Sequence, residues 1–358
     1  HTRELPAPFP FDAPRLRAFY FARNAVWYGA KMLGLQGHEV LVPAYHHGVE
    51  VAALIDAGVV PRFVRVDRQM SLDLEDLKAK ITPETRAIYV IHYAGFPQPM
   101  APIMALARSA GLKVIEDCAL ALLSVDGATP LGATGEVGIF CLYKTIPVPN
   151  GGLLVANSEL PLGLPQLDAP PLASTISHLS TGLMAHMRMG SGNAAVAMLD
   201  GARHVGRRVR RAVEREHIAT GTPQFQHAHL NLAMSRASSV IMGNLHYADI
   251  VAARRRNYAL LLGKLRDVAP PLAAALGTGV CPLFYPLITD HKEALQEALA
   301  ERGIETVDFW REGHPSCPAG EFPEVQQLRR RVLELPIHQD LGPEDMAYLG
   351  QVVREVMP

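Results

Sequence analysis

The feature that most constrains the fold of this chain is the alternation of two patterns over its first 157 residues. Short, almost continuous apolar runs alternate with longer segments in which apolar residues recur every three or four positions. Such apolar runs are typical of strands that are buried on both faces, and the helical spacing is typical of helices packed on a sheet. The alternation therefore predicts an α/β fold in which helices cover both faces of a sheet.

The second half of the chain has a different pattern. A long helix is expected from Ser235 to about Arg266, and a smaller α/β unit follows it, so we divide the chain into a large domain, 1–245, and a small C-terminal domain, 246–358. Irregular structure and interrupted helices are expected over 158–217. In the first half, the expected strands cover 39–45, 60–67, 86–95, 112–119, 135–143 and 151–157, and the expected helices cover 15–35, 48–58, 71–81 (with Ser71 as N-cap) and 100–111.

Composition argues against several classes of function. The formal net charge is −1, so we expect no nucleic-acid partner and interpret the arginine clusters 207–211 and 254–256 as solvated helix faces. We find no apolar run of about 18 residues and no secretion leader, so we expect no membrane contact and a cytoplasmic location. The four cysteines lack metal-ligand spacing, so we expect free thiols and no metal.

Polar residues follow several of the apolar runs. Ligands of open α/β sheets bind beyond the carboxyl ends of the strands, so these residues are candidates for a ligand site. They are Tyr45, His46, His47, His92, Tyr93, Glu116, Asp117, Cys118, Cys141, Tyr143 and Lys144.

Asp117 and Lys144 form the pair with the clearest chemistry. A buried lysine with a lowered pKa can form a Schiff base with an aldehyde, and a carboxylate can keep a pyridine nitrogen protonated. Pyridoxal phosphate needs both groups at neighbouring strand ends. Taken alone, Asp117 also fits a helix N-cap or a paired surface carboxylate, and Lys144 also fits an exposed lysine at a strand end.

Longer stretches around this pair resemble a known family. Residues 90–119, which end in IEDCA, and 130–152, which end in FCLYKTIPVPNGG, resemble the DegT/DnrJ/EryC1/StrS aminotransferases, fold-type-I pyridoxal phosphate enzymes. The resemblance extends to 37–67, 230–258 and 329–356. It implies pyridoxal 5′-phosphate as cofactor and a large domain with a mostly parallel seven-stranded sheet flanked by helices. It also implies a small C-terminal α/β domain and a homodimer with shared active sites.

The resemblance implies roles for residues near the reacting carbon. Lys144 would bind the cofactor as a Schiff base and move a proton, and Asp117 would pair with the pyridine nitrogen. His47 would stack on the cofactor ring, with Tyr45 or His46 as its neighbours toward the substrate.

At the cofactor's phosphate, the resemblance implies a site at the start of the first helix, at Asn24 and Ala25. Asn231 would reach the phosphate from the partner subunit. Ala25, at this phosphate site, has no hydroxyl group. The sequence departs from the family in three further respects. Cys141 takes the place of a serine, Leu120 takes the place of a histidine or glutamine near the cofactor's phenolic oxygen, and an arginine before the long helix is displaced to Arg236 or lost.

The activity implied is transfer of an amino group from glutamate or glutamine to a ketone, commonly a nucleotide-linked keto-sugar, with His338 near the substrate. Leu120 keeps open another reaction on an amino acid, as in a lyase, a racemase or an enzyme that forms carbon–carbon bonds. Leu120, Ala25 and Cys141 also keep open a non-enzymatic relative with a degenerate site. The presence of a lysine and an aspartate at the two reactive positions argues against that last alternative.

Overall fold

A computed structural model describes residues 7–159, 165–179, 218, 224–269, 271–272 and 275–357. The interrupted helices expected over 178–217 fall almost entirely outside the described residues. Within the described residues, none of the helices has the length and apolar character needed to cross a membrane.

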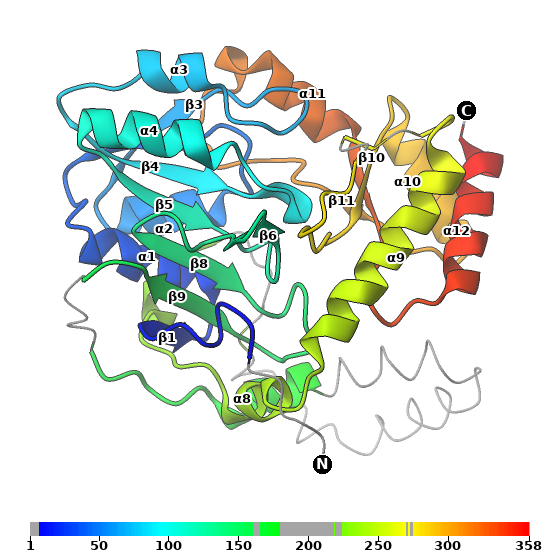
Figure 1. Ribbon diagram of the computed structural model, residues 1–358, viewed down its shortest axis with the longest axis horizontal. Helices are drawn as coiled ribbons and strands as arrows, with labels where there is room; N and C mark the ends of the chain where they lie inside the picture. Colours follow the sequence, from blue (N-terminus) through cyan, green and yellow to red (C-terminus); the bar gives the residue numbers. More distant parts are fainter. Residues whose placement is uncertain are drawn as a thin grey trace.

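The large sheet has seven strands in the order β1-β9-β8-β5-β4-β2-β3 (Figure 1). Strands β3, β2, β4, β5 and β8 are parallel, whereas β9 is antiparallel to both β8 and β1. This arrangement confirms the expected mostly parallel, seven-stranded sheet. The strands are β1 (Leu16–Phe19), β2 (Glu39–Pro43), β3 (Val60–Val64), β4 (Thr85–Ile91), β5 (Lys113–Asp117), β8 (Val137–Cys141) and β9 (Gly152–Ala156).

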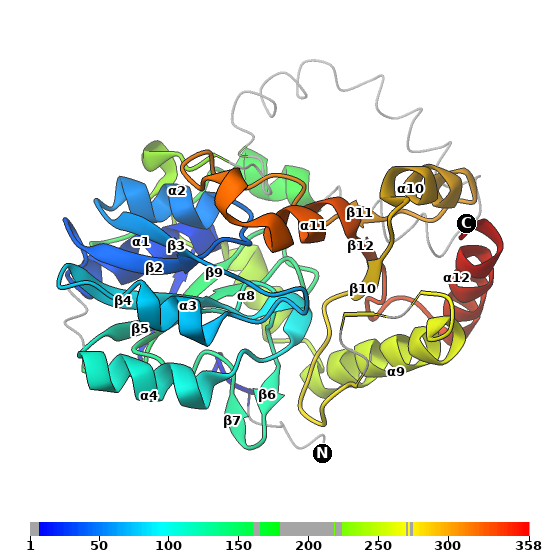
Figure 2. The same ribbon diagram turned by 90° about the horizontal axis from the view of Figure 1, so that it is seen from above.

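Helices cover both faces of this sheet, as expected. Figure 2 shows α1 and α2 on one face and α3 and α4 on the other. Helix α3 begins two residues later than expected, because Asp73 rather than Ser71 accepts the backbone N–H groups of its first turn. The bounds are α1 (Ala22–Met32), α2 (Val49–Asp56), α3 (Leu74–Ala79) and α4 (Met100–Ala110).

The helix expected over 15–35 is wrong in its first part. Residues Leu16–Phe19 instead form β1, which pairs with β9 so that Phe19 lies opposite Gly152. Glycine is required at position 152, because a Cβ atom there would lie 2.2 Å from the backbone nitrogen of Ala22. Close packing of β9 against the start of α1 therefore explains one glycine of the Gly-Gly pair that follows Lys144.

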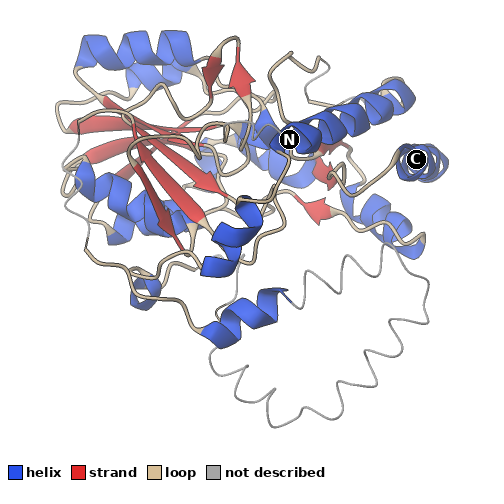
Figure 3. Cartoon of the chain, turned by 60° about the horizontal axis from the view of Figure 1, so that its bottom comes forward, coloured by secondary structure: helices blue, strands red, loops and turns tan. Residues whose placement is uncertain are grey.

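The C-terminal part contains a second, three-stranded sheet in the order β10-β12-β11, and Figure 3 shows it as a separate group of strands. The long helix expected from Ser235 is broken at Gly243, and Ser235 caps only its first piece. The domain boundary at residue 245 stays a prediction. The elements are α8 (Arg236–Met242), α9 (Tyr247–Leu265), β10 (Tyr285–Ile288), α10 (Lys292–Glu301), β11 (Val307–Asp308), α11 (Pro323–Arg331), β12 (Val332–Leu335) and α12 (Pro343–Val356).

Smaller elements complete the described structure. They are a helix at 172–179, the hairpin β6 (Val125–Asp126) and β7 (Thr129–Pro130), and single 3₁₀ turns at Tyr93–Gly95, His227–His229 and Ala319–Glu321.

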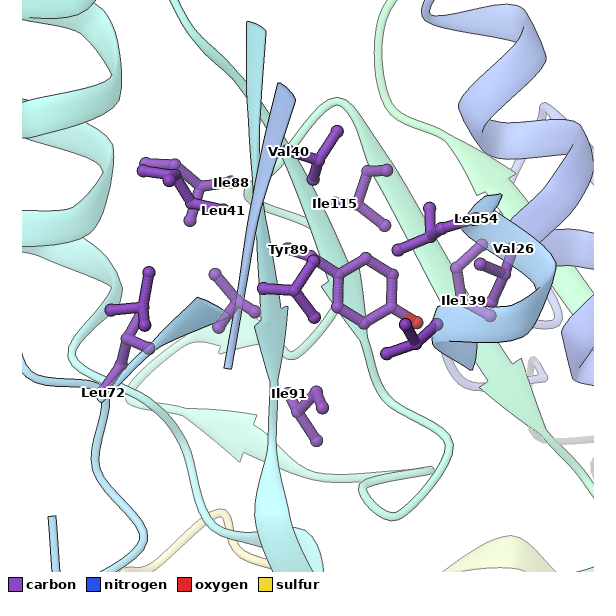
Figure 4. Packing of buried hydrophobic residues seen from close by; sticks show 14 of the residues in the cluster. Val26, Val40, Leu41, Leu54, Leu72, Ile88, Tyr89, Ile91, Ile115 and Ile139 are labelled. Carbon is purple, nitrogen blue, oxygen red and sulfur yellow. The ribbon is translucent and has the colours of Figure 1, made fainter. Parts of the chain in front are cut away.

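The main hydrophobic core extends to the residues at the carboxyl edge of the large sheet. Figure 4 shows Tyr89, on β4, packed among apolar side chains that include Val40, Ile115 and Ile139. The hydroxyl group of this buried tyrosine donates a hydrogen bond of 2.6 Å to Oδ2 of Asp117. The core therefore fixes the orientation of a carboxylate at the sheet edge.

Candidate active site

Two adjoining cavities lie where the carboxyl ends of β5 and β8 meet the small C-terminal sheet. The inner cavity has a volume of about 100 Å³ and the outer cleft about 620 Å³. His47, Leu120, Lys144 and Trp310 line both. The rest of the inner cavity is lined by Ala22, Arg23, Val26, Val49, Glu50, Ile91, Asp117, Ala119, Ile139, Cys141 and Tyr143.

Lys144 lies in the turn after β8, at the junction of the two cavities. The backbone N–H groups of Thr145 and Ile146 both donate to the carbonyl oxygen of Leu142, which tightens this turn. The sequence predicted a buried lysine, but the side chain is exposed, because it borders two open spaces. An amine at this position can reach a molecule in either cavity.

Arg254, on α9, forms hydrogen bonds to the turn that contains Lys144. Its guanidinium group donates to the carbonyl oxygens of Thr145 and Leu283 and to the side chain of Gln339, which also donates to Thr145. Only 2% of Arg254 is exposed, so the expectation of a solvated helix face over 254–256 is wrong for this residue. This buried network fixes the backbone next to Lys144.

We expect Arg254→Ala to lower the free energy of unfolding by about 2–4 kcal/mol, because the buried carbonyl groups would lose their donors. Urea denaturation of the two proteins measures the difference. Arg330→Ala is the control, since this arginine is exposed on α11 and its removal is expected to change stability by less than about 0.5 kcal/mol. Equal stabilities of the two variants would contradict this role of Arg254.

Asp117 ends β5 and is buried at the wall of the inner cavity. Its Oδ2 accepts from Tyr89, and its Oδ1 accepts the backbone N–H of Ala119 at 2.8 Å. Burial raises the pKa of Asp117, and the negative charge of Glu50 raises it further, whereas the two hydrogen bonds and Lys144 lower it. The carboxylate is thus oriented and ready for a cationic or hydrogen-bond-donating partner.

His47 lies in the loop after β2 and lines both cavities. Burial, reinforced by the charges of Lys144, Arg23 and Arg329, lowers the pKa of His47 to about 4, so its ring is neutral at physiological pH. Its Nδ1 has no hydrogen-bond partner among the described residues. A neutral imidazole ring that lines both cavities is suited to pack its face against a planar ligand.

Two further residues of the inner cavity were not predicted from the sequence. Glu50, near the start of α2, accepts the backbone N–H of His47 at 2.8 Å and is buried. Arg23, in the first turn of α1, is also buried, and its Nη1 donates to the carbonyl oxygen of Gln224. That these two side chains line the cavity can be predicted only when the exact first residue of each helix is known.

Asn24 and Ala25 do not line the cavity, although the sequence predicted them there. Helix α1 begins at Ala22, so the residues of its first turn that face the cavity are Ala22 and Arg23. The side chain of Asn24 instead donates to the carbonyl oxygens of His229 and Leu230, and Ala25 lies in the core.

The other predicted residues divide into two groups. Cys141, Leu120 and His338 line a cavity, with His338 in the outer cleft. Asn231 lies away from both cavities, is exposed, and accepts a hydrogen bond from Tyr28. Its predicted action in a partner subunit stays a prediction.

Tyr45 and His46 are buried behind the site instead of facing a substrate. The hydroxyl group of Tyr45 donates to the carbonyl oxygen of Phe309. The ring of His46 stacks on Phe63, and its Nε2 accepts the backbone N–H of His314. Both side chains stabilise the loop after β2 through these contacts. His47 is the residue of that loop that lines the cavities.

Trp310 brings the C-terminal part of the chain to the mouth of the inner cavity. Its φ angle is 51°, a left-handed value that bulky residues rarely adopt. Its ring packs against Phe309 and Tyr45. Strained backbone of this kind is often retained at binding sites, where the strain places a side chain that the site needs.

The described residues contain no group of three or more histidine, cysteine, aspartate or glutamate side chains arranged to hold a metal ion. The site instead presents an oriented carboxylate, a neutral ring and a lysine, with the start of α1 and its arginine on a further wall. The start of a helix and a buried guanidinium favour a phosphate group. This set of groups fits a planar, phosphorylated aldehyde.

Comparison with known proteins agrees with this interpretation. Residues 23–162 match the DegT/DnrJ/EryC1/StrS aminotransferase family. The chain is 27% identical over 330 residues to UDP-N-acetyl-3-dehydro-α-D-glucosamine 3-aminotransferase of Acidithiobacillus ferrooxidans, covering 90% of this chain and 78% of the relative. It is 26% identical over 339 residues to L-glutamine:2-deoxy-scyllo-inosose aminotransferase of Streptoalloteichus tenebrarius, covering 90% and 77%.

Among solved structures, the fold is similar to that of the sugar aminotransferase Spr1654 from Streptococcus pneumoniae in its PMP form. The TM-score is 0.70 at 15% identity, and the match covers 96% of this chain and 86% of the other. At this level of identity the similarity shows the shared fold.

Proposed function

Because this chain belongs to the DegT/DnrJ/EryC1/StrS aminotransferase family, we propose that it transfers an amino group from glutamate or glutamine to a ketone on a polyhydroxylated ring. The observation that carries the proposal is the position of Lys144 at the junction of the inner cavity and the outer cleft. An inner cavity suited to the cofactor and a larger cleft suited to the substrate meet at one amine.

The cofactor of this family is pyridoxal phosphate, which supplies an electron sink that lets an amino group leave one carbon and be delivered to another. In our proposal, Asp117 accepts a hydrogen bond from the ring nitrogen and stabilises its positive charge. His47 packs on the ring face with its neutral imidazole. Lys144 holds the cofactor's aldehyde and then moves a proton at the substrate carbon.

Leu120 and Trp310 have a different task in this proposal. Both line the inner cavity and the outer cleft, and neither carries a charge. They give the space around Lys144 an apolar wall, which would strengthen the interactions of the charged groups there once a bound ligand displaces water. Leu120 offers no hydrogen bond, so the phenolic oxygen of the cofactor is not tuned by this side chain as it is by the histidine or glutamine that the resemblance implies.

The phosphate group of the cofactor is assigned to the start of α1. The first-turn N–H groups of a helix and its dipole attract an anion, and the guanidinium of Arg23 adds a full positive charge. Burial lowers the pKa of Arg23, and the nearby Tyr143 and Cys141 oppose that shift. In our proposal Arg23 takes over the role that the sequence assigned to Asn24 and Ala25.

We expect Arg23→Ala to weaken binding of pyridoxal phosphate by about 10- to 100-fold, because a charge-assisted hydrogen bond to the phosphate is lost. Fluorescence titration of the cofactor-free protein measures this change. Binding of pyridoxal, which lacks the phosphate, is expected to change little. Arg17→Ala, at an exposed position on β1, is the matched control. An equal loss for both ligands would show that Arg23 is not a phosphate ligand.

The amino acceptor is proposed from the relatives, one of which is named for a nucleotide-linked keto-sugar and the other for a free cyclitol ketone. The test incubates the holoenzyme with L-glutamate or L-glutamine and either ketone, and follows amine and keto-acid products by mass spectrometry. Equimolar formation of the two products is the expected result. Release of carbon dioxide or ammonia from the amino acid, or its racemisation without amine transfer, would overturn the proposal.

A further inference from the structure

Glu334 is an ionisable residue at the centre of the small C-terminal sheet. It lies on β12, the middle strand, opposite Pro286 on β10 and Val307 on β11. Its neighbours Leu333 and Leu335 are fully buried in the core of this part of the chain. Glu334 lines the outer cleft, as does the next residue, Leu335. Because side chains alternate along a strand, the Glu334 side chain lies on the face of the sheet opposite to that of Leu333.

The carboxyl group of Glu334 lies in the same cleft as Lys144 and has no partner among the described residues. Lys144 lines the same cleft, and its positive charge lowers the pKa of this carboxyl group. No hydrogen bond or ion pair with the Glu334 side chain is formed by the residues that the structure describes. By contrast, Asp308 in the same cleft is paired with both Lys292 and Arg311.

The position of Glu334 has no benefit for folding that the structure reveals. Burial raises the pKa of Glu334 to about 8, the charge of Asp308 raises it as well, and Lys144 only partly opposes the shift. A carboxyl group held in such surroundings without a partner makes the folded state less stable than an uncharged side chain of similar size would. Groups of this kind are concentrated where a ligand completes their hydrogen bonds.

We propose that Glu334 binds the ketone acceptor, with its carboxyl group hydrogen-bonded to a ring hydroxyl beside the carbon that receives the amine. The proposal rests on the proposed function and adds a substrate class to it, namely ketones that carry a neighbouring hydroxyl group. Bound in this way, the ring is oriented with its carbonyl carbon toward Lys144. A simple keto acid lacks such a hydroxyl and gains nothing from this contact.

The amino donor provides an internal comparison. Glutamate and glutamine have no hydroxyl groups, so removal of the Glu334 carboxyl is expected to affect the acceptor step and to leave the donor step nearly unchanged. Glu334→Met keeps the length of the side chain but cannot hydrogen-bond, whereas Glu334→Gln keeps hydrogen-bonding capacity. Glu297→Met, at an exposed position on α10, controls for the substitution itself.

The experiment measures the two half-reactions separately on the four holoenzymes. The donor step uses L-glutamate, and the acceptor step uses 2-deoxy-scyllo-inosose and UDP-N-acetyl-3-dehydro-α-D-glucosamine with enzyme already in its amino form. We expect Glu334→Met to lower kcat/KM of the acceptor step by about 10- to 100-fold. Glu334→Gln is expected to remain within about 3-fold of the wild type, as is Glu297→Met.

Four outcomes are possible. A selective loss in Glu334→Met with recovery in Glu334→Gln supports the proposal. Equal acceptor steps in Glu334→Met and the wild type overturn it. A parallel loss in both half-reactions also overturns it, because the carboxyl would then act on the site as a whole. If the wild type aminates neither ketone, the proposed function is what fails, and the role of Glu334 fails with it.

Discussion

Lys144→Ala will reduce amino transfer by about 10⁴-fold or more, which is the largest effect expected for a single substitution in this chain. The side chain has two tasks in our proposal, since its amine first holds the cofactor's aldehyde and then moves a proton at the substrate carbon. Among the described residues that line the two cavities, Lys144 is the one lysine, so no second primary amine is placed to hold the aldehyde.

Absorbance spectroscopy with added pyridoxal phosphate provides a second measurement on the same variant. The wild type is expected to show the absorbance band of a covalently held cofactor, and borohydride reduction is expected to fix the cofactor's mass to the peptide that contains Lys144. Lys113→Ala is the control, because this exposed lysine begins β5 at the edge of the sheet opposite to Asp117. Covalent attachment that persists in Lys144→Ala would refute the assignment.

The position of Lys144 and Asp117 on one inner cavity could be predicted because it depends on sheet topology. Strands β5 and β8 are parallel neighbours, so residues at or just beyond their carboxyl ends lie at the same edge of the sheet. Apolar runs in the sequence indicate where such strands end to within a few residues. That precision is sufficient to place a lysine and an aspartate at one edge.

The same precision is insufficient at the start of a helix. The helix was expected to begin at residue 15, whereas α1 begins at Ala22. Within its first turn Arg23 lines the inner cavity and Asn24 and Ala25 do not, because successive residues of a helix point in directions about 100° apart. The true start of α1 is set by β1, whose pairing with β9 leaves the chain free to turn only after Phe19. This is a tertiary constraint, and the helical spacing of residues 15–35 does not contain it.

Glu334 and Trp310 could not be predicted for a related reason. Both belong to the C-terminal part of the chain, and they reach the site only because the small sheet lies against the carboxyl edge of the large one. Neither residue was singled out from the sequence. Only the fold shows that both residues line a cleft that also contains Lys144.

Asp117→Asn is expected to lower kcat by about 100- to 1000-fold, because an amide cannot stabilise the positive charge of the cofactor's ring nitrogen. The local structure is expected to survive the change. The amide oxygen can still accept the backbone N–H of Ala119, and the amide nitrogen can donate to the hydroxyl group of Tyr89. The loss therefore measures the charge at this position and not the shape of the site.

Although Asp117→Asn is expected to lower kcat, it is expected to leave the thermal stability of the cofactor-free protein unchanged or to raise it. The folded protein raises the pKa of Asp117, so the stabilising effect of the neutral acid is complete below the unfolded pKa of about 4 and is lost as pH rises through the folded pKa. Asparagine does not ionise, so above that range the variant is expected to unfold at the same temperature as the wild type or at a higher one. Thermal unfolding of both proteins at pH 5 and pH 8 tests this.

A variant that is stable but nearly inactive would identify Asp117 as a residue kept for chemistry at the expense of folding. Asp126→Asn is the matched control, since this aspartate is exposed on β6 and its replacement is expected to change neither property. Wild-type activity in Asp117→Asn would refute the assignment and direct attention to Glu50, the other buried carboxyl group of the inner cavity. In that case Glu50→Gln, and not Asp117→Asn, would show the loss, because only one carboxylate can face the ring nitrogen.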